Sequence, residues 1–251
     1  WESNVIGTIN ILESVKEFKK KINIIIITSD KVYKNLEINR GYHEKDILGG
    51  EDPYSASKSA ADLATQSYCK TILNNNPNIR IAIARAGNVI GGGDWSVGRI
   101  IPDCMRSWSK FKKVNIRNPK STRPWQHVFD VIYGYLLLAR KNYDEPQKFS
   151  DSYNFSPSVE SCISVKKLLE KMSKVRSVDY IFKENDLYES NFLSLNSNKA
   201  RQELGWKNIY NVDETIKVAY EWYNCFIDDK NIYNMSLMQF NKYMELVNEK
   251  N

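Results

Sequence analysis

The chain has 251 residues, a length that fits one large domain or a domain with a smaller annex. Hydrophobic residues make up 42% and charged residues 26%, which is ordinary globular composition and excludes extensive disorder. The net charge of +6 comes from scattered lysines without any nucleic-acid motif, so a nucleic-acid partner is not expected.

Other classes of protein are excluded by what the composition lacks. No apolar run reaches the 18 or more residues that a membrane span needs, so no membrane partner is expected. The chain has two histidines and four cysteines that lie far apart without a C-x-x-C pair, namely Cys69, Cys104, Cys162 and Cys225. Neither a metal site nor a disulfide framework is expected, and a reducing cytoplasm fits best.

The first part of the chain alternates helices with apolar strands. Residues 3–20 carry apolar side chains at spacings of three and four and end in a basic run, which indicates an amphipathic helix. An all-apolar strand at 23–28, a long helix at 54–73 and a second all-apolar strand at 79–85 follow. Such strands are typical of a parallel sheet covered on both faces, so we predict a doubly wound, Rossmann-like α/β fold.

From about residue 89 the alternation loosens into short strands and helices. Strands are expected at 114–117, 123–129, 152–155 and 178–182, and helices at 97–111, 130–141, 163–174, 196–204, 212–228 and 234–249. We therefore predict that residues 1–89 belong to the sheet domain. Residues 90–251 are expected to form mainly a smaller α+β substrate-binding lobe, interleaved with the sheet domain.

Polar residues follow the predicted strands where ligands bind in such sheets. Thr28-Ser-Asp-Lys31 follows one strand, and Asn88 follows the next. Tyr54 and Lys58 lie four residues apart on one helix face, where a cation beside the phenol favours the phenolate. This pair suggests an acid/base for alcohol–ketone interconversion. The alternatives are a solvated helix surface for the pair and a polar helix cap for residues 29–31.

Longer motifs surround these residues and resemble one superfamily. They are Thr28-Ser-Asp-Lys-Val-Tyr33, Asp52-Pro-Tyr-Ser-Ala-Ser-Lys58, Arg85-Ala-Gly-Asn-Val-Ile-Gly-Gly-Gly-Asp-Trp95 and Arg123-Pro-Trp-Gln-His127. Together they resemble the extended short-chain dehydrogenase/reductases that act on nucleotide sugars, and within them the CDP-glucose 4,6-dehydratases. The likeness covers nearly the whole chain.

The resemblance implies a reaction and a cofactor. NAD would take hydride from the sugar C4 and return it to C6 after water is lost, which gives a 4-keto-6-deoxy sugar for deoxysugar biosynthesis. Tyr54, helped by Lys58, would take the C4 hydroxyl proton, and Lys58 would also bond the nicotinamide ribose. Ser29 would bond the C4 oxygen. Asp30 would serve as the acid toward the C6 oxygen and Lys31 as the base or proton relay.

The resemblance also implies a substrate site and an assembly. Asn88, Arg99, Arg117 and Arg123 would contact the phosphates and nucleotide of CDP-glucose, with Arg123 the foremost candidate. The family is commonly dimeric through helices such as those at 3–20 and 54–73. Trp95 and Trp125 are expected to pack in the core, and His127 to be a hydrogen-bonded structural residue.

A Rossmann sheet needs a Gly-rich turn after its first strand, and this sequence has no G-x-x-G-x-x-G motif. Gly91-Gly-Gly93 is rejected as that turn because Asp and Trp follow it. We expect that the chain begins inside the domain, that on the order of a hundred residues precede it, and that this segment alone binds NAD poorly and is inactive. The alternatives are a 4-epimerase or decarboxylase of the same superfamily and a non-catalytic nucleotide-sugar-binding protein.

Overall fold

The computed structural model describes residues 1–158, 161–176, 179–182 and 193–250, which divide into two compact units. Unit 1 contains the described residues of Trp1–Gly87, Val131–Ser156 and Leu193–Lys207. Unit 2 contains those of Asn88–Asp130, Pro157–Phe192 and Asn208–Asn251. Each unit is thus assembled from three separate segments of the chain.

Unit 1 is built on a parallel sheet of three strands in the order β1-β2-β7. The strands are β1 (Ile22–Ile27), β2 (Ile79–Ala86) and β7 (Ser152–Phe155). Ile22 pairs with Ile79, and Ile83 pairs with Ser152. The central strand β2 is buried along its whole length, which explains its run of Ile and Ala residues. The predicted Rossmann-like parallel sheet is confirmed.

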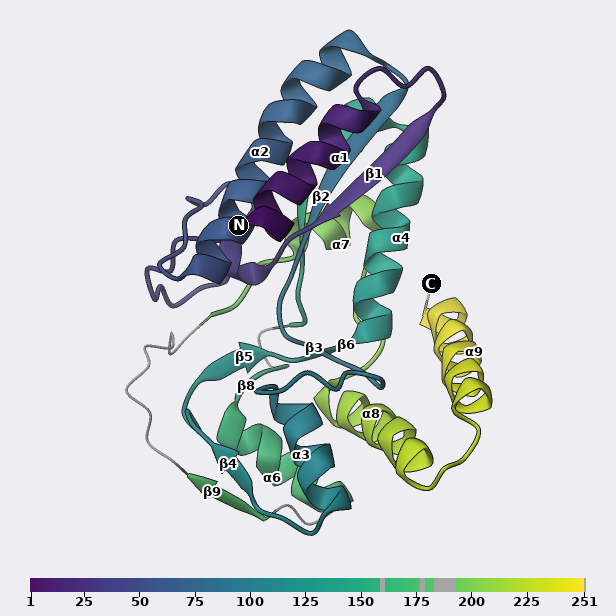
Figure 1. Ribbon diagram of the computed structural model, residues 1–251. Helices are drawn as coiled ribbons and strands as arrows, with labels where there is room; N and C mark the ends of the chain where they lie inside the picture. Colours follow the sequence, from purple (N-terminus) through teal and green to yellow (C-terminus); the bar gives the residue numbers. More distant parts are fainter. Residues whose placement is uncertain (159–160, 177–178, 183–192, 251) are drawn as a thin grey trace. The chain divides into compact units, whose positions relative to one another are not determined.

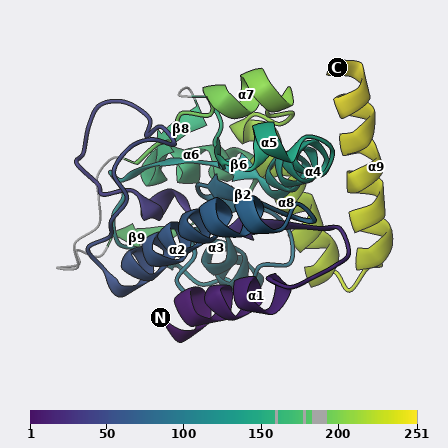
Figure 2. The same cartoon turned by 90° about the horizontal axis from the view of Figure 1, so that it is seen from above.

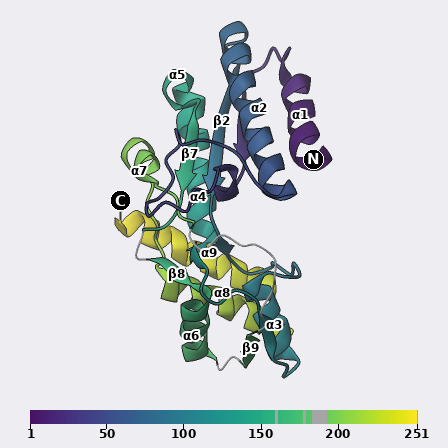
Figure 3. The ribbon, with the colours of Figure 1, turned by 90° about the vertical axis from the view of Figure 1, so that its left-hand side faces the viewer.

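Helices cover both faces of this sheet. They are α1 (Gly7–Val15), α2 (Pro53–Asn75), α4 (Val128–Asp144), α5 (Pro146–Phe149) and α7 (Asn198–Leu204). Figures 2 and 3 show α1 and α2 on one face and α4, α5 and α7 on the other. Leu12 and Val15 of α1 are packed on Ile79 and Ile81, while Phe155 lies in the core on the opposite face.

The first helix is shorter than predicted. A turn of π-helix at Glu2–Ile6 leads into α1, which ends at Val15 rather than at residue 20. The basic residues that follow form a turn into β1, because a run of like charges gains little from continuing a helix. The apolar spacing nevertheless identified Leu12 and Val15 as core residues correctly.

Unit 2, as far as the structure describes it, combines two-stranded pairings with helices (Figure 1). The pairs are β3 (Val89–Ile90) with β6 (Gln126–His127), β4 (Val114–Ile116) with β9 (Tyr180–Phe182), and β5 (Thr122–Pro124) with β8 (Cys162–Ser164). The helices are α3 (Ile100–Ser109), α6 (Val165–Val175), α8 (Val212–Ile227) and α9 (Ile232–Lys250). One apolar core packs β4 against α3, α6 and α8.

Two sequence predictions in unit 2 need correction, and the last helix has a contact that the sequence did not indicate. The expected strand at 123–129 is two short strands, and α4 already begins at residue 128. The expected helix at 163–174 is preceded by β8, so α6 begins at Val165. The last helix, α9, is tied to α8 because Trp222 Nε1 donates to Ser236 Oγ at 2.9 Å.

No helix of the described residues is long and apolar enough to cross a membrane.

Candidate functional site

The first turn of α2 presents Tyr54 because of the residues that begin the helix. Pro53 occupies the first helical position, where its missing N–H is no loss. The side chain of Asp52 accepts hydrogen bonds from the backbone N–H groups of Tyr54 at 2.9 Å and Ser55 at 3.1 Å. This cap fixes the start of α2, and Lys58 follows one turn later on the same face.

The Tyr54 and Lys58 side chains have capacity left for a ligand. Tyr54 is 48% exposed, and its hydroxyl makes no hydrogen bond within the described part of the chain. Lys58 Nζ donates to the Ile27 carbonyl at 3.3 Å, its one hydrogen bond among the described residues. Two of its N–H groups therefore remain to donate. Partial burial lowers the pKa of Lys58.

Asp30–Val32 form a single turn of 3-10 helix after β1, and Ser29 is its N-cap. Ser29 Oγ accepts from the backbone N–H of Lys31 at 3.2 Å and donates to Asp30 Oδ1 at 2.8 Å. The helix-cap alternative for this motif is thus confirmed. Because the hydroxyl has a single proton, Ser29 can bond a sugar oxygen as donor only by releasing Asp30.

Asp30 and Lys31 lie in different environments beside Tyr54. Asp30 is buried, whereas Lys31 is exposed, with its Nζ 6.0 Å from the centroid of the Tyr54 ring. Burial, followed by the charge of Asp30, raises the pKa of Tyr135 well above its usual range. Tyr135 is therefore a neutral phenol near Asp30 that the sequence analysis missed. Nothing in the spacing of residue 135 indicates this neighbourhood.

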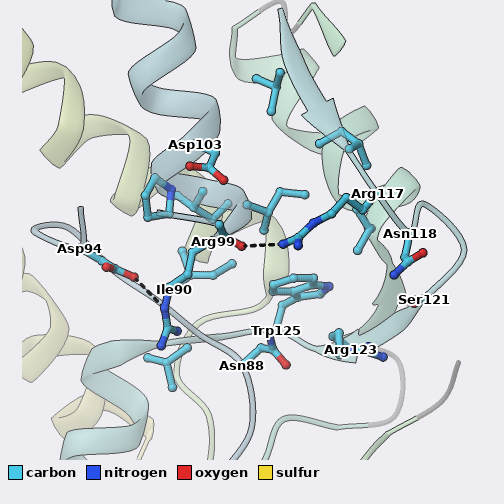
Figure 4. Close-up of a pocket in the computed structure, with 18 of the residues that line it drawn as sticks. Asn88, Ile90, Asp94, Arg99, Asp103, Arg117, Asn118, Ser121, Arg123 and Trp125 are labelled. Atoms are coloured by element: carbon cyan, nitrogen blue, oxygen red, sulfur yellow. Dashed lines mark hydrogen bonds and ion pairs between the residues drawn. The ribbon is translucent and has the colours of Figure 1, made fainter. Parts of the chain in front are cut away.

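The four predicted substrate residues line one cavity of about 200 Å³ within unit 2 (Figure 4). Asn88 comes from the loop after β2, Arg99 precedes α3, Arg117 follows β4, and Arg123 lies on β5. Arg99 is exposed and lies 3.8 Å from Asp94. Arg117 is also exposed and donates to the Gly98 carbonyl at 3.4 Å. Both guanidinium groups are thus only weakly held.

Arg123 differs from the other two arginines because it is only 6% exposed. Its Nη1 donates to the Thr122 carbonyl at 2.8 Å. Within the described ranges no carboxylate lies within 4.0 Å of this guanidinium, so its charge is not neutralised there. A buried cation without a counter-charge is costly, and the cavity it lines is therefore suited to an anion.

Further cavity residues were not predicted from the sequence. Three polar side chains come from the segment around β4 and β5, namely Asn115, Asn118 and Ser121. Trp125 also lines the cavity, while its Nε1 donates to the Ile163 carbonyl at 3.0 Å. Trp125 thus packs in the core as expected and also forms a wall of the cavity. The run of mostly polar residues from 115 to 123 could have indicated these additional cavity residues.

The Gly91–Gly93 loop has a packing explanation. A Cβ atom on Gly92 would lie 2.2 Å from the Trp222 ring, and one on Gly91 would lie 2.5 Å from Val128 Cγ1. No side chain fits at either position, so glycine lets the loop closely approach Val128 at the start of α4 and Trp222 on α8. The loop joins β3 to the segment before α3 and does not open a helix.

His127 has the structural role that the sequence indicated. It is buried, and its Nδ1 accepts from the backbone N–H of Phe129 at 3.2 Å. Burial lowers the pKa of His127 to about 4, so the ring is neutral at pH 7. The rings of Phe129 and Tyr210 pack against it in T-shaped contacts, with centroid distances of 4.8 Å and 5.2 Å.

The sequence model of one family, described as GDP-mannose 4,6 dehydratase, matches residues 1–219. The chain belongs to this dehydratase family. It is 37% identical over 251 residues to a CDP-glucose 4,6-dehydratase from Salmonella typhimurium, covering 97% of this chain and 70% of that protein. The resemblance stated from the motifs is thereby confirmed.

Solved structures of other dehydratases and epimerases share the fold. A dTDP-glucose 4,6-dehydratase from Bacillus anthracis in complex with NAD superimposes with a TM-score of 0.78 at 22% identity, over 89% of this chain and 68% of that one. A UDP-glucuronic acid 4-epimerase from Bacillus cereus, in complex with UDP-glucuronic acid and NAD, gives a TM-score of 0.76 at 18% identity, over 90% and 69%. At 22% and 18% identity, these two comparisons show that the chain shares the fold of the solved structures and nothing beyond the fold.

Proposed function

We propose that this chain carries the catalytic residues for the NAD-dependent dehydration of CDP-glucose to CDP-4-keto-6-deoxyglucose. The observation that carries the proposal is that two pairs of residues, Asp30 with Lys31 and Tyr54 with Lys58, lie close together in unit 1. The Nζ atom of Lys31 is 6.0 Å from the centroid of the Tyr54 ring, and Lys58 follows Tyr54 by one helical turn. An epimerase needs the Tyr54 pair but no acid and base for elimination. The relationship to a CDP-glucose 4,6-dehydratase supports the same substrate.

The residues present fit the nicotinamide side of NAD. Lys58 has two N–H groups left to donate to the diol of a ribose, and the Tyr54 hydroxyl is exposed beside it. When bound, NAD supplies a hydride acceptor for C4 and a hydride donor for C6. Tyr54 and Lys58 are the residues that we assign to cofactor binding as well as to proton transfer.

In the oxidation step, Tyr54 as phenolate takes the proton of the C4 hydroxyl. The Lys58 cation stabilises that phenolate electrostatically. Ser29 bonds the C4 oxygen once its hydroxyl turns away from Asp30. The C4–H electrons leave as hydride, and the sugar becomes a 4-ketone.

In the elimination step, the ketone makes the C5 proton acidic. Lys31 removes that proton through its amine nitrogen, and the C5 electron pair forms the C5–C6 double bond. Asp30 gives a proton to the departing C6 oxygen, which leaves as water. Hydride then adds to C6, and a proton returns to C5, so the product differs from the substrate by one water.

The cavity in unit 2 is our candidate for the diphosphate and nucleotide of the substrate. Arg guanidinium groups bind phosphate oxygens in a bidentate manner. Arg123, whose buried charge has no carboxylate nearby within the described residues, is proposed as the main phosphate ligand. Asn88, Arg99 and Arg117 complete the assigned set.

Replacing Arg123 with Met is expected to raise the dissociation constant for CDP-glucose roughly 10- to 100-fold, because a charge-assisted hydrogen bond is worth about 1.5–3 kcal/mol. Isothermal titration calorimetry measures this constant. Arg140→Met is the matched control, since that side chain is 80% exposed on α4 and pairs only with Asp144 among the described residues. If the two variants bound CDP-glucose with equal affinity, Arg123 would not be a phosphate ligand.

We also propose that the protein is a homodimer through α1 and α2. Exposed apolar side chains on these two helices support this, among them Ile6 just before α1, Ile11 and Leu63. Leu63→Glu is expected to convert a species of twice the chain mass into the monomer in analytical ultracentrifugation. Leu136→Glu on α4, where the leucine is 63% exposed against 52% for Leu63, is the control and should stay dimeric. A wild-type protein that sediments as the monomer contradicts the proposal.

The compartment that we propose is the cytoplasm. All four cysteines are free thiols in the structure, which suits a reducing compartment.

The proposed reaction is tested with the natural gene product that contains this chain, incubated with NAD and CDP-glucose in D₂O. Mass spectrometry should show a product lighter by one water that carries one solvent deuterium at C5. A product of unchanged mass would indicate an epimerase instead. Binding of CDP-glucose without any turnover would indicate a non-catalytic binding protein.

A further inference from the structure

An ion pair is completely buried in unit 1, between α2 and the central strand. Asp62 and Arg85 both have side-chain exposures of 0%. Arg85 donates to Asp62 through Nε at 2.8 Å and through Nη2 at 2.7 Å. The same carboxylate accepts from Thr28 Oγ1 at 3.0 Å and from Gln66 Nε2 at 2.8 Å. Asp62 thus accepts four hydrogen bonds, which is its full capacity.

Arg85 is saturated as well. Its remaining N–H groups reach the Tyr33 hydroxyl at 2.7 Å, the Glu44 carbonyl at 3.1 Å and Ser152 Oγ at 3.1 Å. All five guanidinium donors are therefore used. Because neither charge has a free donor or acceptor, the pair is not a ligand site, and its function must lie in what it holds in place.

The pair holds the end of β1 against α2. Tyr54, Lys58 and Asp62 follow each other at intervals of four residues, so they lie on one face of α2. Lys58 Nζ bonds the carbonyl of Ile27, and Asp62 bonds the hydroxyl of Thr28. Ser29 follows Thr28 directly. Among the described residues, the Thr28 hydroxyl therefore provides a link between two side chains, in addition to the Lys58 bond, from the strand that leads into the Asp30–Val32 turn to the helix that carries Tyr54.

We propose that Thr28, held by the Asp62–Arg85 pair, is a positioning residue that fixes the elimination residues Asp30 and Lys31 relative to the redox residues Tyr54 and Lys58. This inference rests on the proposed function. Both pairs act on one sugar, the redox pair at C4 and the elimination pair at C5 and C6, so the distance between the turn and α2 sets both geometries at once. A misplacement of about 1 Å can cost on the order of 100-fold in rate.

Thr28→Val tests the link, because it removes the hydroxyl and keeps the shape and the ion pair. The expected result is a kcat for CDP-glucose that is roughly 5- to 50-fold lower, with KM within about twofold of wild type. Thr28→Ser keeps the hydroxyl and should restore most of kcat. Thr65→Val is the matched control, since Thr65 is also buried on α2 but, within the described part of the chain, its hydroxyl bonds only the Ala61 carbonyl of its own helix, at 2.8 Å.

A second measurement separates this proposal from the proposed reaction. Amide hydrogen exchange of the Asp30–Val32 turn should be faster in Thr28→Val than in wild type and unchanged in Thr65→Val. If the wild type does not turn over CDP-glucose, the proposed function fails, while the exchange result still decides whether Thr28 holds the turn. Unchanged exchange, an unchanged kcat, or equal losses in Thr28→Val and Thr65→Val would each overturn the positioning role.

Discussion

Asp30→Asn is expected to stop the loss of water while leaving the oxidation at C4 in place. The amide keeps the oxygen that accepts from Ser29, at 2.8 Å in the wild type, so the 3-10 turn should persist. It has no acidic proton to give to the departing C6 oxygen. Removal of a general acid lowers the rate of its step by roughly 10²- to 10⁴-fold. Reduced nicotinamide should therefore accumulate, and the sugar should keep its oxygen.

Tyr54→Phe provides the contrasting result. It removes the group that takes the C4 proton, so neither reduced nicotinamide nor dehydrated product should form at more than about 1% of the wild-type rate. Asp144→Asn, an exposed change on α4, is the control and should behave as wild type.

These variants are followed by absorbance of the nicotinamide and by mass spectrometry of the sugar. An epimerase would tolerate Asp30→Asn, because it never expels the C6 oxygen. Dehydration by Asp30→Asn at close to the wild-type rate would remove Asp30 from the mechanism, whatever the result with Tyr54→Phe.

Elements with a strong local pattern could be predicted from the sequence. The apolar strand predicted at 23–28 is β1 (Ile22–Ile27), because five of its six residues are isoleucine and β-branched side chains favour strands. Helix α2 was predicted to within a few residues, since Asp52 and Pro53 mark its start. The end of α1 was missed, because apolar spacing indicates which face is buried but not where the helix stops.

The candidate site was only partly predictable, since burial depends on tertiary packing. Arg99, Arg117 and Arg123 look alike in the sequence, but only Arg123 is buried. The link between Asp62 and Arg85 was missed altogether. Its signals were present: an arginine in an otherwise apolar strand needs a buried partner, and Asp62 is eight residues after Tyr54 on the same face.

Asp62→Asn is expected to lower the free energy of unfolding by about 3–5 kcal/mol. The neutral amide cannot balance the charge of Arg85, which would then be buried without a counter-ion. Its NH₂ group would also face one of the guanidinium N–H groups that Asp62 now accepts. Chemical denaturation measures this change by linear extrapolation.

The chain contains a matched control for the effect of burial. Arg40 and Asp46 also form a bidentate pair, through Nη1 at 2.6 Å and Nη2 at 2.8 Å, but their side chains are 48% and 23% exposed. Asp46→Asn should therefore cost only about 0–1 kcal/mol. A similar cost for the two substitutions would mean that water reaches the Asp62–Arg85 pair.

The double variant Asp62→Asn with Arg85→Met separates the charge from the packing. Removing both charges leaves no uncompensated ion, so it should recover most of the stability lost in Asp62→Asn alone. Thr28 and Gln66 donate to different oxygens of Asp62, so the single oxygen of Asn can accept from only one of them in the wild-type geometry. A double variant as unstable as Asp62→Asn would show that the cost arises from altered packing around Asp62, and the buried charge would not be its cause.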